Sequence, residues 1–297
     1  MTRAVDERRE AASEPQPSRP SPVGAAGAPA SSVAATAIDA AGTAPAAPPP
    51  PALTPGVFIN EVMAWSAALA VVGVAATVQT PQATALLSDD VIRSTALRHL
   101  GLEVLCCCLA AAVLFMGLRR SKPMAAGMFS FAAEPGALST AALLAAVAYP
   151  LADPLLHQAC LAAEQALGVS ALLPDPGSGL AAQLAEARQA GDGLSLALHG
   201  AASCLVGPLW EETFWRGFFL ASMTRVLPLP ACVAASSTLF AALHLGPGNL
   251  LPIAGLSAAC DLLYLRTGSL AAPLLFHAGW NAYELAGILV LGREAFV

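Results

Sequence analysis

Residues 195–222 read SLALHGAASCLVGPLWEETFWRGFFLAS and decide the fold. The stretch is longer than the roughly 20 mainly apolar residues that a membrane-spanning helix needs. Its apolar residues cover all faces of a helix, which at this length favours lipid over a soluble core. Glu211, Glu212 and Arg216 interrupt it, although a charge inside a bilayer costs at least about 2.5–3.5 kcal/mol. The stretch therefore predicts a membrane-spanning helix that carries a functional site.

Other stretches on both sides of this one are also apolar enough to span a membrane. They lie at 61–79, 100–118, 136–152, 229–245, 248–265 and 270–291. We therefore expect an all-α fold, a polytopic membrane helix bundle of about seven spans. Between the third and fourth spans lies a polar stretch, 153–193, in which we predict an interfacial helix near 180–190.

The composition of the whole chain agrees with a membrane protein. Of its 297 residues 56% are hydrophobic and 11% are charged, whereas a soluble domain carries about 25% charged residues. This excludes an ordinary soluble globule. The net charge of −6 and the absence of a long basic run in the sequence also argue against nucleic-acid binding. The expected surroundings are a lipid bilayer.

The first residues differ from the rest in composition. Residues 1–56 are rich in Ala, Pro, Ser and Gly and carry no aromatic residue, so we predict a disordered tail. Its arginines and serines suit a transit peptide, whereas its acidic residues do not. We divide the remainder into N-terminal spans with the polar loop, 57–194, and a catalytic core, 195–291.

Basic residues in the short loops predict the orientation of the spans. The loops after 100–118, 195–222 and 248–265 each carry Lys or Arg. If seven spans alternate, all these loops lie on one side, which is then the cytosolic or stromal side. The N-terminus is expected on that side too.

The spacing of the ionisable residues in the last third of the chain indicates a shared site. Glu212 and Arg216 are four residues apart, so they share one helix face and can pair. Glu211 lies about 100° further around the helix and must have different neighbours. His277 and Asn281 are again four residues apart, so both side chains can point into one cavity.

These residue types indicate activation of a water molecule. A carboxylate in a low-dielectric pocket becomes a better base, so Glu211 with His244 is expected to hold and deprotonate a water for attack on a carbonyl. His277 and Asn281 are expected to donate hydrogen bonds to the resulting oxyanion. Glu212, paired with Arg216, is expected to give structural support.

Two other kinds of chemistry were weighed against this one. The sequence has no nucleophilic serine or cysteine in a recognisable elbow, which disfavours a covalent route. It also has no H-E-x-x-H motif. Glu211, His244 and His277 nevertheless form a suitable ligand set for a divalent metal such as zinc. We favour water activation without an obligatory metal and keep zinc as the open alternative.

Three motifs on successive apolar segments carry a resemblance. Residues 211–216 (EETFWR) fit E-E-x-x-x-R, residues 240–244 (FAALH) fit F-x-x-x-H, and residues 277–281 (HAGWN) fit H-x-x-x-N. In this order they resemble the CAAX protease and bacteriocin-processing (CPBP, Abi) family of intramembrane proteases, which includes the type II CAAX prenyl endopeptidases. The resemblance covers about 195–291, and the residues after Arg216 look closest to the cyanobacterial and plastid branch.

The resemblance implies an intramembrane endopeptidase that acts on a membrane-associated protein or peptide, with prenylated CAAX proteins as the best-known target. It places the family's catalytic residues on Glu211 and His244 and its oxyanion pair on His277 and Asn281. Members of the family are called metalloproteases. The implied location is a plastid membrane or a bacterial plasma membrane. The alternatives are a non-catalytic scaffold or chaperone-like binder of the same fold and, less favoured, an ion carrier.

One feature of the sequence conflicts with this site. In straight helices Glu211 lies near mid-membrane and His244 at the end of its short span, about 15 Å apart in depth at 1.5 Å per residue. Pro247 and Gly248 follow His244, so a broken helix is the expected solution. If the site is real, the two side chains must lie no more than one water apart.

Several other polar residues are left outside the predicted site. Asp261 stands where the resemblance leads to a small residue, and Glu284 continues the face of His277 and Asn281 by one turn. His99 and His157 are expected at the protein surface, and His199 at the membrane interface. The seven cysteines are expected to be small buried hydrophobes.

Overall fold

The fold is described here from a computed structural model, which describes residues 90–118, 129–173, 179–224, 227–244 and 246–292. The predicted tail and the first predicted span, 61–79, lie outside the described residues. Every regular element within the described residues is helical, which confirms the all-α fold. Five helices are long and apolar enough to cross a membrane, and they identify a multi-pass integral membrane protein: α3 (Val91–Leu118), α4 (Pro135–Leu167), the helix Gly193–Met223, α10 (Leu250–Thr267) and α11 (Ala271–Leu291).

The helix Gly193–Met223 changes its winding twice. It consists of α6 (Gly193–Ala201), the π-helical η4 (Ala202–Val206), α7 (Gly207–Glu212), the π-helical η5 (Thr213–Leu220) and α8 (Ala221–Met223). Asp192 caps its start, because its Oδ1 accepts a hydrogen bond from the Ser195 N–H at 3.2 Å. Single π-helical turns inside α-helices often mark functional sites, and here they flank the segment that ends in Glu211 and Glu212.

Helix α9 (Leu229–Ala242) is shorter than the predicted span 229–245. Its 14 residues extend about 21 Å at 1.5 Å per residue, less than the roughly 30 Å of a bilayer's hydrocarbon core. The helix ends three residues before the predicted limit, and Pro247 further along disfavours helical backbone at Gly246. His244 therefore lies beyond the end of the helix.

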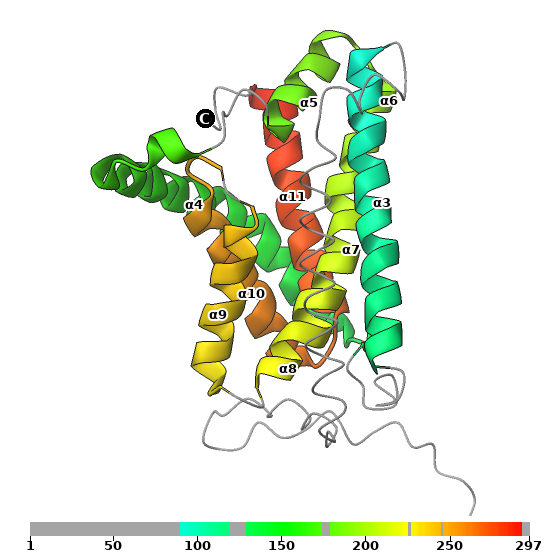
Figure 1. The fold of residues 1–297 in the computed structure, drawn as a ribbon, viewed down its shortest axis with the longest axis vertical. Coiled ribbons are helices and arrows are strands. Elements are labelled where there is room, and N and C mark those ends of the chain that lie inside the picture. The colour runs from blue at the N-terminus through cyan, green and yellow to red at the C-terminus, as the bar shows by residue number, and fades with distance from the viewer. Residues whose placement is uncertain (1–89, 119–128, 174–178, 225–226, 245, 293–297) are drawn as a thin grey trace, which may run out of the picture. The chain divides into compact units, whose positions relative to one another are not determined.

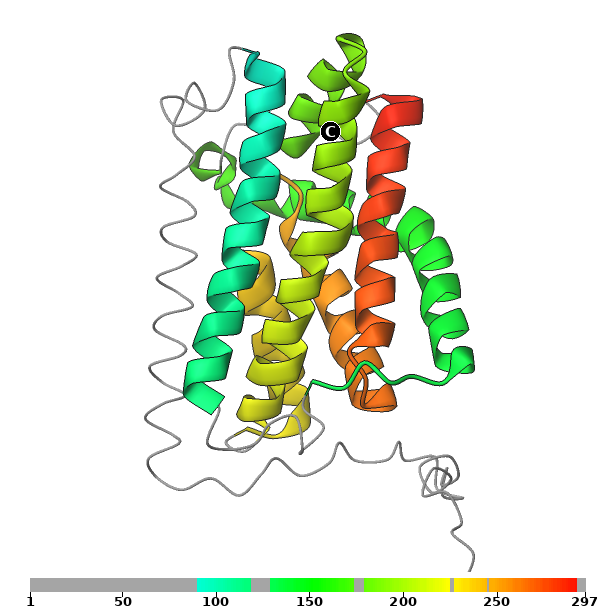
Figure 2. The ribbon, with the colours of Figure 1, turned by 90° about the vertical axis from the view of Figure 1, so that its right-hand side faces the viewer.

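Helix α4 is longer than the predicted span 136–152. The prediction that the chain is a polar loop from 153 onward is wrong, since the helix continues to Leu167. Pro150 and Pro154 lie inside it, and its two halves run in different directions (Figure 2), as expected of a proline kink. After the 3₁₀ turn η2 (Ser170–Leu172), the interfacial helix predicted near 180–190 is present as α5 (Leu180–Gln189).

The helices pack side by side in a way that brings the three motifs together. In Figures 1 and 2, α3 runs beside the helix Gly193–Met223, which in turn lies beside α11. Helix α10 contacts α9, α11 and α4. The three segments that carry the motifs are therefore neighbours in space.

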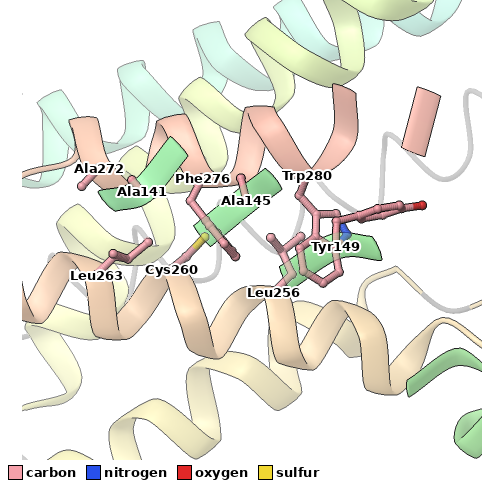
Figure 3. Packing of buried hydrophobic residues seen from close by; sticks show 9 residues of the cluster. All are labelled: Ala141, Ala145, Tyr149, Leu256, Cys260, Leu263, Ala272, Phe276 and Trp280. Atoms are coloured by element: carbon pink, nitrogen blue, oxygen red, sulfur yellow. The ribbon is translucent and has the colours of Figure 1, made fainter. Parts of the chain in front are cut away.

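A core of small and aromatic side chains joins α4, α10 and α11. Each of the three helices contributes three of the buried side chains shown in Figure 3: Ala141, Ala145, Tyr149, Leu256, Cys260, Leu263, Ala272, Phe276 and Trp280. The small residues let the helix backbones approach closely, as is typical of helix packing in membranes. This core fixes the position of α11, which carries His277.

Candidate active site

Three separate segments bring Glu211, His244 and His277 together. The Oε1 atom of Glu211 lies 3.5 Å from Nε2 of His244, and its Oε2 atom lies 3.7 Å from Nε2 of His277. Glu211 comes from α7, His277 from α11, and His244 from the turn after α9. The prediction that Glu211 and His244 lie within one water is confirmed. The early end of α9 removes the expected difference in depth.

The second nitrogen of each histidine is held by an oxygen. Nδ1 of His244 lies 2.8 Å from the Phe240 carbonyl, and Nδ1 of His277 lies 2.8 Å from Oε1 of Glu212. A carbonyl oxygen only accepts hydrogen bonds, so Nδ1 of His244 carries a proton. The Glu212 carboxylate also only accepts, so Nδ1 of His277 carries a proton too. In a neutral imidazole the Nε2 lone pair then faces Glu211. Two lone pairs and a carboxylate directed at one another require a proton, a water or a cation between them.

Phe240 holds the two imidazoles at a fixed angle. The His244 ring stacks on it with centroids 4.6 Å apart, and the His277 ring meets it edge-on at 5.9 Å. Phe240 is itself buried between Trp215 and the Arg216 guanidinium, which lies 5.2 Å from its centroid. Phe240 therefore acts on the site through packing.

Glu212 and Arg216 form the predicted ion pair behind the site. Nη1 of Arg216 donates to Oε1 of Glu212 at 3.0 Å, and both side chains are buried. Because Oε1 also accepts from His277, the pair orients that imidazole. The adjacent carboxylates of Glu211 and Glu212 thus differ in their partners, as the helix geometry predicts, although both face His277.

Asn281 satisfies a backbone carbonyl that the π-helical turn leaves free. In this turn the Gly207 N–H donates to the Ala202 carbonyl. With the same five-residue spacing, the Ser203 carbonyl would accept a hydrogen bond from residue 208. Residue 208 is a proline and has no N–H to donate. Asn281 donates its Nδ2–H to Ser203 at 2.8 Å instead. Its second N–H remains for another partner, so the oxyanion role stays a prediction.

The site opens into a cavity of about 210 Å³. Its polar lining includes all four residues predicted to be catalytic, Glu211, His244, His277 and Asn281. Its apolar lining includes Leu184 of α5 together with Leu285 and Ile288 of α11. The cavity has room for several waters, and its lining is partly polar and partly apolar.

Glu103 of α3 belongs to the same cavity and was missed by the sequence analysis. Its Oε2 accepts a hydrogen bond from the Trp210 indole N–H at 2.7 Å, directly before Glu211 in the chain. Gly207 makes room for it, since a Cβ there would lie 3.3 Å from the same oxygen. The available signal was one acidic residue inside the apolar run 100–118.

The structure also corrects the placement of three residues. His199 is fully buried rather than interfacial, and its Nδ1 lies 2.9 Å from Nδ1 of a partly buried His99. These rings join α3 to α6, a pairing that no local pattern reveals. Asp261 is fully buried and contacts Arg216. Four of the seven cysteines, Cys106, Cys160, Cys232 and Cys260, are buried as predicted, whereas Cys107 and Cys204 are half-buried and Cys108 is exposed.

A buried carboxylate holds the turn after His244. Both oxygens of Glu164 in α4 accept from the Gly248 N–H, at 3.0 and 3.1 Å. Gly248 has φ +74°, and a Cβ there would overlap the His157 ring. The left-handed backbone and the close approach both require glycine at this position. This contact joins the second half of α4 to the turn after His244.

The donor atoms around Glu211 are chemically compatible with a divalent metal. Two imidazole Nε2 atoms and one carboxylate match a zinc ligand set, and oxygen-bound Nδ1 atoms are typical of metal-ligating histidines. A tighter group in the described residues is Glu212, Cys260 and His277, whose donor atoms lie within 4.8 Å of one another. That group already holds Arg216 against Glu212, which opposes a second cation. A metal at Glu211, His244 and His277 stays the open alternative.

Comparison with known proteins assigns this part of the chain to a family. Residues 193–283 match the family model described as type II CAAX prenyl endopeptidase Rce1-like. Comparisons with curated proteins and with solved structures found no match. The matched segment begins at α6, includes every residue of the three motifs and ends within α11. Assignment to the cyanobacterial and plastid branch stays a prediction. The chain therefore carries, over residues 193–283, a domain of the Rce1-like family of type II CAAX prenyl endopeptidases, a family of membrane proteases.

Proposed function

We propose that this protein is an intramembrane endopeptidase that hydrolyses a peptide bond of a membrane-associated protein by water activation at Glu211. The observation that carries the proposal is the position of the Glu211 carboxylate, between the Nε2 atoms of His244 and His277 at 3.5 and 3.7 Å. This group lines a cavity of about 210 Å³. Both imidazoles are oriented from behind, so the site is organised before a substrate enters.

The first step is the attack of water on the scissile carbonyl. A water between Glu211 and His244 donates one hydrogen to the carboxylate and the other to the Nε2 lone pair. As its oxygen bonds to the carbonyl carbon, Glu211 accepts the proton. The carbonyl becomes a tetrahedral oxyanion, which the second N–H of Asn281 can stabilise. His277 can add a second hydrogen bond when its Nε2 is protonated.

The second step returns the proton to the leaving group. The carbon–nitrogen bond breaks, and the proton held on Glu211 passes to the departing nitrogen. The products are an acid and an amine, and Glu211 is again a carboxylate. No covalent intermediate with the enzyme forms, which agrees with the lack of a nucleophile elbow in the sequence. Glu212 and Arg216 hold the His277 imidazole throughout and take no part in the proton transfer.

A metal is compatible with this site but is not required by these steps. If zinc were bound by Glu211, His244 and His277, it would supply Lewis-acid polarisation of the carbonyl and a more acidic water. We propose that the residues act without it. Activity that survives a strong chelator supports this choice, whereas a loss restored by added zinc overturns it.

The proposed substrate is a membrane-associated protein, with a prenylated CAAX-type chain as the first choice. Support comes from the family match and from the apolar wall of the cavity at Leu184, Leu285 and Ile288. The comparison substrate is a peptide that is tethered to the membrane but carries no prenyl group.

The test measures cleavage in proteoliposomes by the wild type and by Glu211→Gln, His244→Ala and Glu186→Gln. Glu186 is an exposed carboxylate of α5 and serves as the matched control. We expect cleavage by the wild type and the control, with the other two variants at least about 10³-fold slower, the scale of losing a catalytic base. Equal product from all four proteins would overturn the proposal and favour a non-catalytic binding protein.

A further inference from the structure

Asp261 lies fully buried in α10, outside the three motifs, and holds the back of the site. Its Oδ1 accepts from Nε of Arg216 at 3.0 Å and from the Ser236 hydroxyl at 3.3 Å. Its Oδ2 lies 3.5 Å from the Ser237 hydroxyl. A carboxylate at this depth costs several kcal/mol unless its partners compensate for the lost hydration. Asp261 therefore needs Arg216, and Arg216 is shared between two acids.

Arg216 is fixed on every side by these contacts. Nη1 donates to Glu212, Nε donates to Asp261, and Nη2 donates to both the carbonyl and the hydroxyl of Ser257 at 2.8 Å. The planar guanidinium carries its donors in a rigid fork, so fixing Nε and Nη2 also fixes the direction of Nη1. Asp261 thus determines where Nη1 meets Glu212.

The orientation of the Glu212 carboxylate depends strongly on the direction of Nη1 of Arg216. Its Oε1 accepts both from Arg216 and from Nδ1 of His277. In the described part of the chain, its Oε2 is buried without a hydrogen-bond partner. The Cys260 thiol also interacts with this carboxylate, but a thiol is a weak hydrogen-bond donor and holds the carboxylate less firmly than Arg216 does. If the guanidinium turns, Oε1 turns with it, and the His277 imidazole loses the contact that directs its Nε2 toward Glu211.

We propose that Asp261 is a positioning residue of the cleavage site, which orients His277 through Arg216 and Glu212. The expected effect of Asp261 on catalysis rests on the proposed function. The effect of Asp261 on the His277 imidazole can be measured without any cleavage. Asp261 touches neither the cavity nor His277 directly. The relay consists of charge-assisted hydrogen bonds, which are about twice as strong as neutral ones.

The kinetic test uses Asp261→Asn, which keeps an acceptor for Nε but removes the charge, and Ser236→Ala, which removes one hydroxyl from Asp261. Glu186→Gln is again the matched control, because Glu186 is an exposed carboxylate of α5. For Asp261→Asn we expect kcat to fall between about tenfold and a hundredfold, the range for a displaced catalytic group, with KM unchanged. Ser236→Ala should show a smaller loss in the same direction.

A double mutant with Glu212 distinguishes a positioning role of Asp261 from a purely structural one. In a Glu212→Gln background, Asp261→Asn should cause no further loss of kcat, because the relay is already broken. If the two losses multiply, or if kcat per folded molecule is unchanged in Asp261→Asn, the proposal is wrong. Folded protein is counted by its helical circular dichroism and its thermal unfolding in micelles.

A spectroscopic test decides the proposal even if the wild type cleaves no offered substrate. Histidine labelled with ¹⁵N reports which ring nitrogen carries the proton, and the His277 signal is assigned by its loss in His277→Gln. The wild type and Glu186→Gln should show His277 protonated at Nδ1. Asp261→Asn should show a mixture of tautomers. An unchanged His277 spectrum in Asp261→Asn overturns the relay, whereas absent cleavage by the wild type counts only against the proposed function.

Discussion

The indole N–H of Trp210 donates to Oε2 of Glu103 at 2.7 Å, and this bond joins α3 to the residue directly before Glu211. Glu103 lies in the first described helix and Trp210 in the helix of the E-E-x-x-x-R motif. Gly207, one turn before Trp210, lets the carboxylate approach the helix closely. The position of Glu211, the proposed catalytic carboxylate, is thus tied to a segment outside the matched domain.

We expect Trp210→Phe and Glu103→Leu each to lower kcat, because each removes this bond and frees Glu211 to shift. Glu103→Gln should keep more activity, since its amide oxygen still accepts from the indole. The measurement is a double-mutant cycle on kcat/KM, with an expected coupling of about 1–3 kcal/mol for a hydrogen bond to a charged group. Losses that simply add would show that the two residues act independently.

The close approach of α11 to α4 makes Gly279 sensitive to a single methyl group. A Cβ at Gly279 would lie 2.9 Å from the Cβ of Ala145, a buried residue of the core in Figure 3. Gly279→Ala should lower the free energy of unfolding by about 1–3 kcal/mol, the usual cost of overpacking. Unfolding by sodium dodecyl sulfate in mixed micelles measures this change.

Two further variants control this prediction. Gly101→Ala in α3 has open space around the new methyl group and should be neutral or slightly stabilising. Ala145→Gly combined with Gly279→Ala should recover much of the lost stability, because it removes the opposing methyl. Equal stability of Gly279→Ala and Gly101→Ala would show that the helices can separate without cost.

Asp192 makes the stability of the protein depend on pH at the start of the helix Gly193–Met223. The Ser195 hydroxyl, which donates to Oδ2 at 2.7 Å, lowers the pKa of Asp192 below its ordinary value, as do the Ser195 N–H and Arg93. A lowered pKa means that folding favours the carboxylate. This stabilisation is complete above the ordinary aspartate pKa, about 3.9. It is lost as the pH falls through the lower pKa of the folded state.

Thermal unfolding in micelles across pH, for the wild type and Asp192→Ala, measures this contribution. The wild type should melt at a higher temperature than the variant at neutral pH, and the difference should shrink in strong acid. Ser195→Ala should show a smaller difference with the same trend. A gap between wild type and Asp192→Ala that stays constant down to low pH would contradict the role of the carboxylate.

Local rules of the sequence were sufficient for the motifs but not for their surroundings. Helical periodicity placed Glu212 with Arg216 on one face and gave Glu211 other neighbours, and the structure confirms this pairing. The pairing of Glu211 with His244 followed from the motif resemblance, and the break after α9 was expected from Pro247 and Gly248. These inferences succeeded because they depend on contacts within one or two turns, or on a rare charge in an apolar run.

The chain's composition and spacing by themselves determined an all-helical membrane protein with a Glu/His site, since few charges occur inside long apolar stretches. Only the tertiary structure decided which remote side chains complete that site. Glu103, Glu164 and Asp261 come from three other helices, and their roles depend on how α3, α4 and α10 pack against the motif segments. A lone acidic residue in a helix looks the same in sequence whether it meets solvent, lipid headgroups or Arg216. The role of such a residue is decided by the helix packing that buries it and removes its hydration.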